Sequence, residues 1–238
     1  MNNSQNLPLV MLPGFLCDPR LWGDVLANLP PGDDIILIDF KHCKSLQDMV
    51  GQLEKLETSR FHLVGFSMGA YIAKIFATKF PERVASLTLV ATNVGALSER
   101  EQTSRSKLAG MLANVQYKGM NEKEAQRFIH SSSAQNPHVV QTIVEMSRSY
   151  TSEMYIAQMR ATLHREDLSA EIAKLSFPVL IVAGKDDHVV RLPTLQHLHE
   201  VVARSKILIL DQCGHYVPLE KAKELSVAIH EFVNSGGA

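Results

Sequence analysis

The sequence is poor in several features that mark particular classes of protein. Its 238 residues include one tryptophan and three cysteines, Cys17, Cys43 and Cys213. An odd number of widely spaced cysteines does not build a disulfide framework, and no Cys-x-x-Cys pair is present to hold zinc. A chain of this length can bury a sizeable core without either aid. We therefore expect one large domain, or one domain with an insertion, and no metal site.

An excess of charge of one sign and long apolar runs are also missing. The chain has 24 Lys and Arg against 25 Asp and Glu, whereas a nucleic-acid-binding protein usually carries a basic stripe. No apolar run approaches the roughly 20 residues needed to cross a bilayer. Residues 1–6 lack the basic and apolar parts of a signal peptide. We therefore expect a cytoplasmic protein, a monomer or a homodimer, with neither nucleic acid nor a membrane as partner.

Six short apolar runs recur along the chain and are bounded by Gly, Pro or Asp. They are rich in Val, Ile and Leu and do not alternate with polar residues. This composition is typical of strands that are buried on both faces of a parallel sheet. The expected strands are residues 9–12, 35–38, 62–64, 87–91, 179–183 and 207–210.

Helical patterns separate most of these runs. Residues 46–56 and 219–233 carry apolar side chains with a 3.6-residue period. Residues 68–80 are apolar on most sides, and Pro81 ends this helix. Strands that alternate with helices are joined by right-handed crossovers. The sequence therefore predicts an α/β fold with a doubly wound, mainly parallel sheet of about six strands.

One stretch interrupts the alternation. Residues 95–168 contain no convincing strand, are helix-prone, and are too long for a simple loop. We expect a helical lid inserted before the strand 179–183, with residues 1–94 and 169–238 forming the core. Five of the nine methionines lie in this lid and are either core filler or a flexible apolar pocket lining: Met111, Met120, Met146, Met154 and Met159.

The sequence Gly65-Phe66-Ser67-Met68-Gly69 links an apolar strand to a long helix. In this context a Gly-x-Ser-x-Gly pattern indicates a turn so tight that side chains at the two glycine positions would clash. Such a turn strains the serine backbone and exposes the hydroxyl at a helix N-terminus, where developing negative charge is favoured. Ser67 is therefore the candidate nucleophile, and the alternative is that it only caps the helix.

A serine hydroxyl needs a base, and the base needs an orienting acid. His215 follows the strand 207–210, and Gly214 permits a sharp turn that would bring the imidazole to the sheet edge of Ser67. Two carboxylates, Asp186 and Asp187, follow the strand 179–183. Asp187 is favoured as the acid because it stands three residues after the glycine that ends this strand. Asp186 is the alternative, and a third interpretation is that both are solvated loop residues.

Serine, aspartate and histidine in this chain order resemble the α/β-hydrolase superfamily, and the resemblance covers residues 9–233. Two further motifs agree with it, Phe80-Pro-Glu-Arg-Val and Phe177-Pro-Val-Leu-Ile-Val-Ala-Gly. The resemblance implies a catalytic triad of Ser67, Asp187 and His215. It also implies an acyl-enzyme reaction that hydrolyses carboxylic esters of small to medium, largely apolar substrates without a cofactor.

The segment Leu12-Pro-Gly-Phe-Leu-Cys-Asp is similar to the oxyanion loop of a subgroup of small bacterial hydrolases. By this resemblance the backbone N–H groups of Phe15 and Met68 would form the oxyanion hole. Most relatives have His-Gly in place of Pro13-Gly14, so a side-chain contact behind the loop is missing here.

Fold alone does not fix the chemistry. The same superfamily supports carbon–carbon bond hydrolysis, thioester cleavage, lyase reactions and non-catalytic ligand receptors. The candidate lining of the substrate pocket is Leu16, Trp22, Val189, Tyr216, Met111 and Met159.

Overall fold

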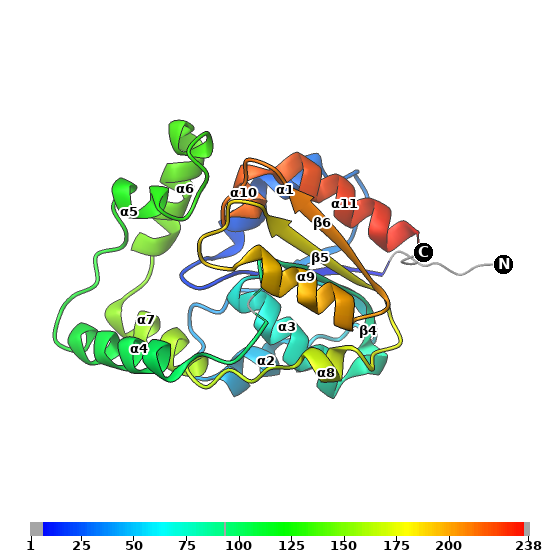
Figure 1. Cartoon of the computed structure of the whole chain (residues 1–238), viewed down its shortest axis with the longest axis horizontal. Coiled ribbons are helices and arrows are strands. Elements are labelled where there is room, and N and C mark those ends of the chain that lie inside the picture. The colour runs from blue at the N-terminus through cyan, green and yellow to red at the C-terminus, as the bar shows by residue number, and fades with distance from the viewer. Residues whose placement is uncertain (1–6, 93, 236–238) are drawn as a thin grey trace.

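The structure, a computed structural model, describes residues 7–92 and 94–235. Its centre is one sheet of six strands in the order β2-β1-β3-β4-β5-β6, and every pairing in it is parallel (Figure 1). The predicted α/β fold with a parallel sheet is therefore confirmed. The strands are β1 (Leu9–Leu12), β2 (Ile35–Leu37), β3 (Phe61–Phe66), β4 (Val84–Val90), β5 (Val179–Gly184) and β6 (Ser205–Leu210).

Helices cover both faces of this sheet, as a doubly wound fold requires (Figure 1). One face packs against α2 (Leu46–Glu54), α3 (Met68–Lys79), α8 (Ser169–Ile172) and α9 (Leu192–Val201). The other packs against α1 (Gly23–Asn28), α10 (Val217–Glu220) and α11 (Ala222–Asn234). Short 3-10 turns precede α1 (Pro19–Trp22) and β4 (Pro81–Arg83).

The unbroken apolar runs follow from this double cover. Successive side chains of a strand point to opposite faces, so a strand with both faces covered needs apolar residues at every position. In β5, Val179, Ile181 and Ala183 join the core on one face, while Leu180 and Val182 join the core on the other. Strand β5 is buried along its whole length.

The C-terminal helix differs from the prediction. The expected single helix over residues 219–233 is two helices, because Lys221 has non-helical dihedral angles of φ −137° and ψ 45°. Helix α10 starts two residues earlier than expected, with Pro218 in its first turn. The apolar period runs through the break, since Leu219 and Leu225 reach the same core. Periodicity therefore could not reveal a change of conformation at one residue.

Residues 95–168, which follow β4, contain helices and no strand. These helices lie beyond the sheet edge toward which the arrowheads of β5 and β6 point (Figure 1). They contact each other in pairs, α4 with α7 and α5 with α6. The elements are α4 (Glu99–Leu112), α5 (Glu122–Gln126), a 3-10 turn (Ser133–Gln135), α6 (Pro137–Arg148) and α7 (Ser152–Ala161).

The turn from β3 to α3 brings backbone segments unusually close together. A Cβ atom at Gly65 would lie 2.6 Å from Ala70 Cα, and one at Gly69 would lie 2.4 Å from the backbone oxygen of Leu12. Real side chains do not occupy such positions, and the obstructing atoms are backbone atoms that cannot move aside. The two glycines of the Gly-x-Ser-x-Gly pattern are therefore required by close approach, as the sequence predicted.

We predict that Gly65→Ala lowers the free energy of unfolding by about 1–3 kcal/mol, because it overpacks a backbone contact. Gly51 lies inside α2 with open space around its Cβ position, so it provides the matched control. Gly51→Ala should instead stabilise the protein by about 0.5–1 kcal/mol through helix propensity. Urea unfolding of both variants measures the two effects, and effects of the same sign would contradict the prediction.

Candidate active site

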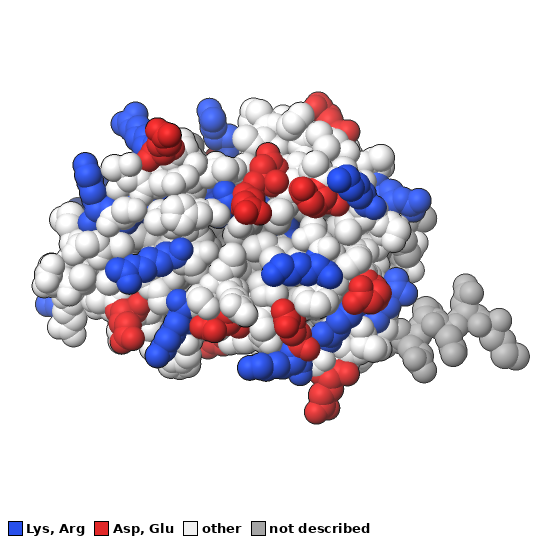
Figure 2. All heavy atoms as spheres, turned by 90° about the horizontal axis from the view of Figure 1, so that it is seen from below, with Lys and Arg blue, Asp and Glu red and all other residues white. Residues whose placement is uncertain are grey.

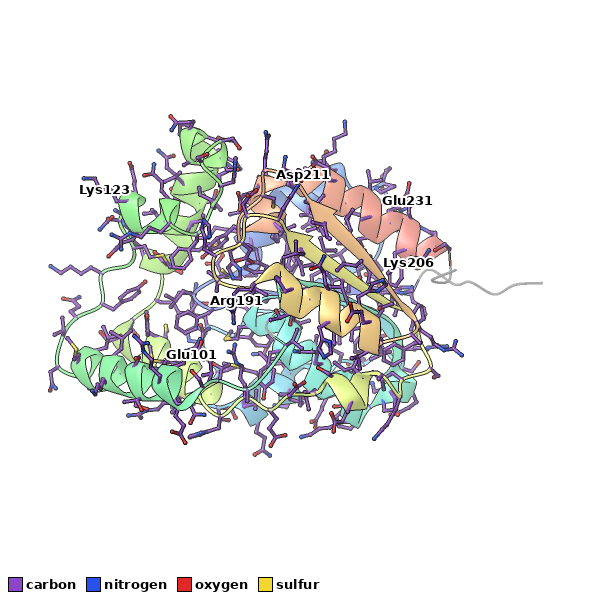
Figure 3. The ribbon with its side chains drawn as sticks, viewed as in Figure 1. Glu101, Lys123, Arg191, Lys206, Asp211 and Glu231 are labelled. Carbon is purple, nitrogen blue, oxygen red and sulfur yellow. The ribbon has the colours of Figure 1, made fainter. Side chains whose placement is uncertain are left out.

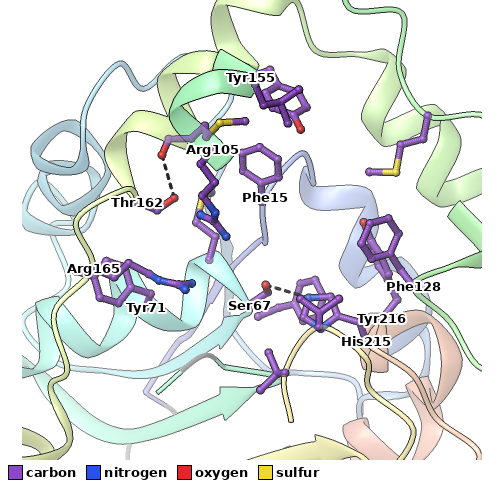
Figure 4. A pocket seen from close by; sticks show the side chains of 17 residues that line it. Phe15, Ser67, Tyr71, Arg105, Phe128, Tyr155, Thr162, Arg165, His215 and Tyr216 are labelled. Carbon is purple, nitrogen blue, oxygen red and sulfur yellow. Dashed lines mark hydrogen bonds between the residues drawn. The ribbon is translucent and has the colours of Figure 1, made fainter. Parts of the chain in front are cut away.

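Ser67 stands at the sharp turn between β3 and α3. Its backbone has φ 50° and ψ −108°, a strained conformation for a residue other than glycine. Its side chain makes no capping hydrogen bond to α3, so the alternative interpretation of Ser67 as a helix cap is wrong. Its Oγ lies 3.0 Å from Nε2 of His215, as the dashed line in Figure 4 shows.

His215 lies on the loop between β6 and α10 and is buried. Its backbone N–H donates to the carbonyl of Phe128, 2.7 Å away, in the long helical segment. The left-handed residue of this loop is Gln212, with φ 51°, so Gly214 does not make the sharp turn that the sequence suggested. A Cβ at Gly214 would instead lie 2.8 Å from the backbone of Ile129. This glycine serves close packing of the helical segment against the histidine loop.

The carboxylate of Asp187 holds the other side of the imidazole. Its Oδ2 lies 2.8 Å from His215 Nδ1, and its Oδ1 accepts hydrogen bonds from the N–H groups of Val189 and Val190 at 2.7 and 2.9 Å. Both oxygens are therefore used, and the side chain is almost completely buried. Asp186 points elsewhere, with a carboxylate oxygen 4.0 Å from His130 Nε2. The geometry thus distinguishes the two neighbouring aspartates.

The backbone N–H groups of Phe15 and Met68 are available for a ligand. Neither donates a hydrogen bond to another residue of the described ranges. Met68 is the first residue of α3, where the helix dipole adds partial positive charge. Phe15 lines the same cavity as Ser67. These two groups are the oxyanion donors that the resemblance implies, and such a role requires N–H groups without a partner in the protein.

The loop that carries Phe15 is held from the helical segment. The next residue, Leu16, has φ 56°, and its N–H donates to Oε1 of Gln158 over 3.0 Å. Gln158 belongs to α7 and is fully buried. Its Nε2 reaches the hydroxyl of Tyr150 at 3.4 Å, and that hydroxyl donates to the Cys17 carbonyl at 2.6 Å. The oxyanion loop lacks the side-chain contact that a histidine provides in most relatives. Gln158 and Tyr150 support the loop here.

A cavity of about 260 Å³ opens beside Ser67 and His215 (Figure 4). Most of its wall is apolar or aromatic, and two arginines also reach it. Eight of its seventeen lining residues come from the segment 95–168. The lining is Phe15, Phe66, Ser67, Met68, Tyr71, Arg105, Leu108, Met120, Phe128, Tyr155, Met159, Thr162, Arg165, Val189, Val190, His215 and Tyr216.

Three of the six predicted pocket residues lie elsewhere. Leu16 is turned into the protein by its left-handed backbone and is buried away from the cavity, and Trp22 is fully buried in the core. Met111 is 68% exposed near the end of α4. Closeness in sequence to the oxyanion loop therefore did not imply access to the pocket. The other three, Val189, Tyr216 and Met159, do line the cavity.

Both interpretations of the methionines in the helical segment hold, each for different residues. Met120 and Met159 line the cavity, whereas Met146 of α6 is fully buried as core filler.

Several site residues had no recognisable signal in the sequence. The carboxylate of Glu220 accepts the N–H groups of Gly214 and His130 at 3.0 and 2.7 Å, and so joins the histidine loop to the helical segment. Gln158 and Arg105 come from helices, and Arg165 from the chain between α7 and α8, whose packing no local pattern specified. A glutamine in a helix does not reveal from sequence that it supports a loop. The partner of Gln158 is Leu16, which lies 142 residues away.

The cysteines are poor candidates for a nucleophile. Burial raises the pKa of the Cys17 thiol to about 12 and that of Cys43 to about 11. Burial also raises the pKa of the Cys213 thiol far above its usual value. Because the thiolate is the nucleophilic form, these side chains stay unreactive at neutral pH.

The chain belongs to the α/β-hydrolase fold family. The model of that family, described as alpha/beta hydrolase fold, matches residues 8–222. This confirms the family that the sequence motifs indicated. The protein is accordingly a hydrolase of this fold family.

The curated relatives are distant. Mouse monoacylglycerol lipase ABHD6 is 24% identical over 95% of this chain and 75% of its own length. The 2-hydroxy-6-oxononadienedioate/2-hydroxy-6-oxononatrienedioate hydrolase of Burkholderia vietnamiensis is 25% identical over 92% of this chain and 75% of its own length.

Solved structures share the fold at lower identity. A thermophilic esterase from Thermogutta terrifontis has a TM-score of 0.88 and 23% identity, covering 98% of this chain and 91% of its own. The enol-lactonase from Burkholderia xenovorans has a TM-score of 0.80 and 17% identity, covering 98% and 94%.

The charged side chains of the surface give no sign of a partner with one kind of charge. On the face seen from below, basic and acidic side chains are interspersed and form no stripe of one sign (Figure 2). None of the helices within residues 7–92 and 94–235 combines the length and apolarity that crossing a bilayer requires.

We predict that Gln158→Leu lowers the free energy of unfolding by about 1–3 kcal/mol, because it leaves the Leu16 N–H without its acceptor. Gln141 is exposed on α6, and Gln141→Leu is the matched control with an expected change within about 0.5 kcal/mol. Denaturant unfolding monitored by circular dichroism measures both. Equal stability of the two variants would show that Gln158 does not hold the loop.

Proposed function

We propose that this protein is a serine hydrolase that cleaves carboxylic esters through an acyl-enzyme. One observation carries the proposal: an unbroken hydrogen-bond chain runs from Ser67 through His215 to Asp187, with distances of 3.0 and 2.8 Å, and its serine end faces the cavity. This is the arrangement that activates a serine hydroxyl.

In the first half of the reaction His215 takes the proton of Ser67 as Oγ attacks the ester carbonyl carbon. Asp187 keeps Nδ1 of the imidazole protonated and stabilises the imidazolium that forms. The carbonyl oxygen gains negative charge and is bound by the N–H groups of Phe15 and Met68. His215 then gives its proton to the leaving oxygen, and the alcohol departs.

In the second half a water molecule takes the place of the alcohol. His215 removes a proton from the water as it attacks the acyl-enzyme carbonyl, and the same N–H groups bind the oxyanion. His215 then returns the proton to Ser67 Oγ, and the carboxylic acid is released. No step needs a group other than these side chains, two backbone amides and water.

The cavity supports small to medium substrates. Its volume of about 260 Å³ is near the lower end of common ligand pockets, and aromatic side chains supply much of its wall. We divide the chain into a core, residues 1–94 and 169–238, and a lid, residues 95–168. Because the lid supplies nearly half of the cavity lining, we infer that it selects the substrate while the core performs the chemistry.

We predict that Ser67→Ala lowers kcat by a factor on the order of 10⁶ while the thermal unfolding midpoint barely changes. The hydroxyl makes no capping bond and faces the cavity, so its loss removes little packing. The measurements are turnover of chromogenic esters of varied acyl length and labelling by a fluorophosphonate probe. Retention of more than a few per cent of esterase activity would refute the assignment. Ligand binding with neither labelling nor turnover would indicate a receptor instead.

We predict that Asp187→Asn lowers kcat by a factor on the order of 10⁴, because the imidazole loses the partner that fixes its tautomer. Asp186→Asn is the matched control, since this carboxylate does not contact His215, and its kcat should stay within a few-fold of the parent. Steady-state kinetics on one chromogenic ester decide between them. A crippled Asp186 variant beside an active Asp187 variant would reverse the assignment.

A further inference from the structure

Two arginines of the lid reach the cavity, and the proposed mechanism uses neither. Arg105 comes from α4, and Arg165 comes from the chain between α7 and α8. In Figure 4 both guanidinium groups point into the cavity, on the side of Ser67 opposite His215. Both side chains are half-buried.

Neither guanidinium has a protein partner among the described residues. No hydrogen bond or ion pair within 4.0 Å joins Arg105 or Arg165 to any of them, and Nε of Arg165 is buried without a partner. An arginine offers five N–H donors, and burying them without acceptors is costly. The other donors of the two guanidinium groups are open to the cavity, where water or a ligand can supply the acceptors.

The neighbouring carboxylate of Glu101 forms no hydrogen bond or ion pair with either arginine. Glu101 lies at the end of α4 nearest the sheet (Figure 3), and its Oε2 accepts the N–H and hydroxyl groups of Ser98 at 2.9 and 2.7 Å. Burial and the neighbouring Arg105 lower the pKa of Arg165 to about 10, while Glu101 opposes the shift. Arginine side chains are charged at neutral pH, so two of them with one carboxylate give the group a net positive charge.

We propose that Arg105 and Arg165 form an anion-binding subsite that holds a carboxylate on the acyl part of the substrate, so that the preferred substrates are monoesters of short dicarboxylic acids. The planar guanidinium matches the two oxygens of a carboxylate. This inference rests on the proposed ester hydrolysis and adds the class of ester.

The position of the histidine decides which part of the ester carries the charge. His215 must protonate the leaving oxygen, so the alcohol part lies on the His215 side of Ser67. That side is aromatic: the Tyr216 ring lies 6.0 Å from the imidazole and 6.3 Å from the Phe128 ring. The acyl part therefore extends the other way, toward the arginines (Figure 4).

The test compares two esters that differ in one charge. They are 4-nitrophenyl hemiglutarate, which has a free carboxylate, and 4-nitrophenyl methyl glutarate, which does not. Charge-assisted hydrogen bonds of this kind are worth roughly a 10- to 100-fold preference in kcat/KM for the hemiester. Arg165→Met and Arg105→Met should each reduce this ratio about tenfold or more. Arg100→Met, on the exposed side of α4, is the matched control and should leave the ratio unchanged.

A second measurement does not depend on turnover. Calorimetry should detect glutarate binding to the parent protein and to Ser67→Ala, with the affinity lost about tenfold or more in Arg165→Met. Equal kcat/KM for the two esters, or glutarate affinity that is indifferent to the arginines, would overturn the anion subsite and leave ester hydrolysis standing. Absence of turnover for both esters, together with arginine-dependent glutarate binding, would instead overturn the ester proposal and keep the anion site.

Discussion

The hydrogen-bond chain from Ser67 to Asp187 depends on backbone segments that lie closer together than side chains would allow. The β3–α3 turn presses against its own helix and against β1, and the end of β5 touches the histidine loop, where a Cβ at Gly184 would lie 2.1 Å from the Gly214 oxygen. Each contact brings one member of the site to the same sheet edge. The parallel sheet supplies that edge, because the carboxyl ends of its strands all lie there.

The lid also holds the residues of the site in place. Gln158 holds the loop that carries Phe15, and the Phe128 carbonyl accepts the N–H of His215. Residues from the lid thus fix both the expected oxyanion donor and the expected base. If the lid selects the substrate as proposed, then substrate selection and positioning of the reacting groups are linked, and a change in lid packing would alter both.

Local patterns predicted the parts of the molecule that depend on local physics. A strand that is covered on both faces has apolar residues at every position, so the sequence predicted the sheet. The close backbone approach at residues 65 and 69 requires glycine, so the sequence also predicted the serine turn. The order of the strands then places Ser67, Asp187 and His215 at one edge, where the structure brings them within hydrogen-bond distance.

Long-range packing left no such trace. Leu16 lies in the oxyanion loop directly after Phe15, but its own left-handed backbone turns its side chain away from the cavity. Arg165, in contrast, enters the cavity from a position about 100 residues beyond Ser67. The break at Lys221 was hidden because apolar periodicity reports which face is buried and not whether each residue is helical. Side-chain direction at the site is decided by contacts between segments, and these are absent from local sequence.

The carboxylate of Glu220 has a consequence for the order in which the protein matures. It joins the N–H of Gly214 to the N–H of His130, which lies 90 residues earlier in the chain. Loops of this length close late, because their entropy must be lost before the contact stabilises anything. During synthesis the serine turn and the lid are made well before Glu220. The imidazole therefore reaches its place only when the C-terminal region folds, and until then the Ser67 hydroxyl lacks the hydrogen-bond partner that His215 provides.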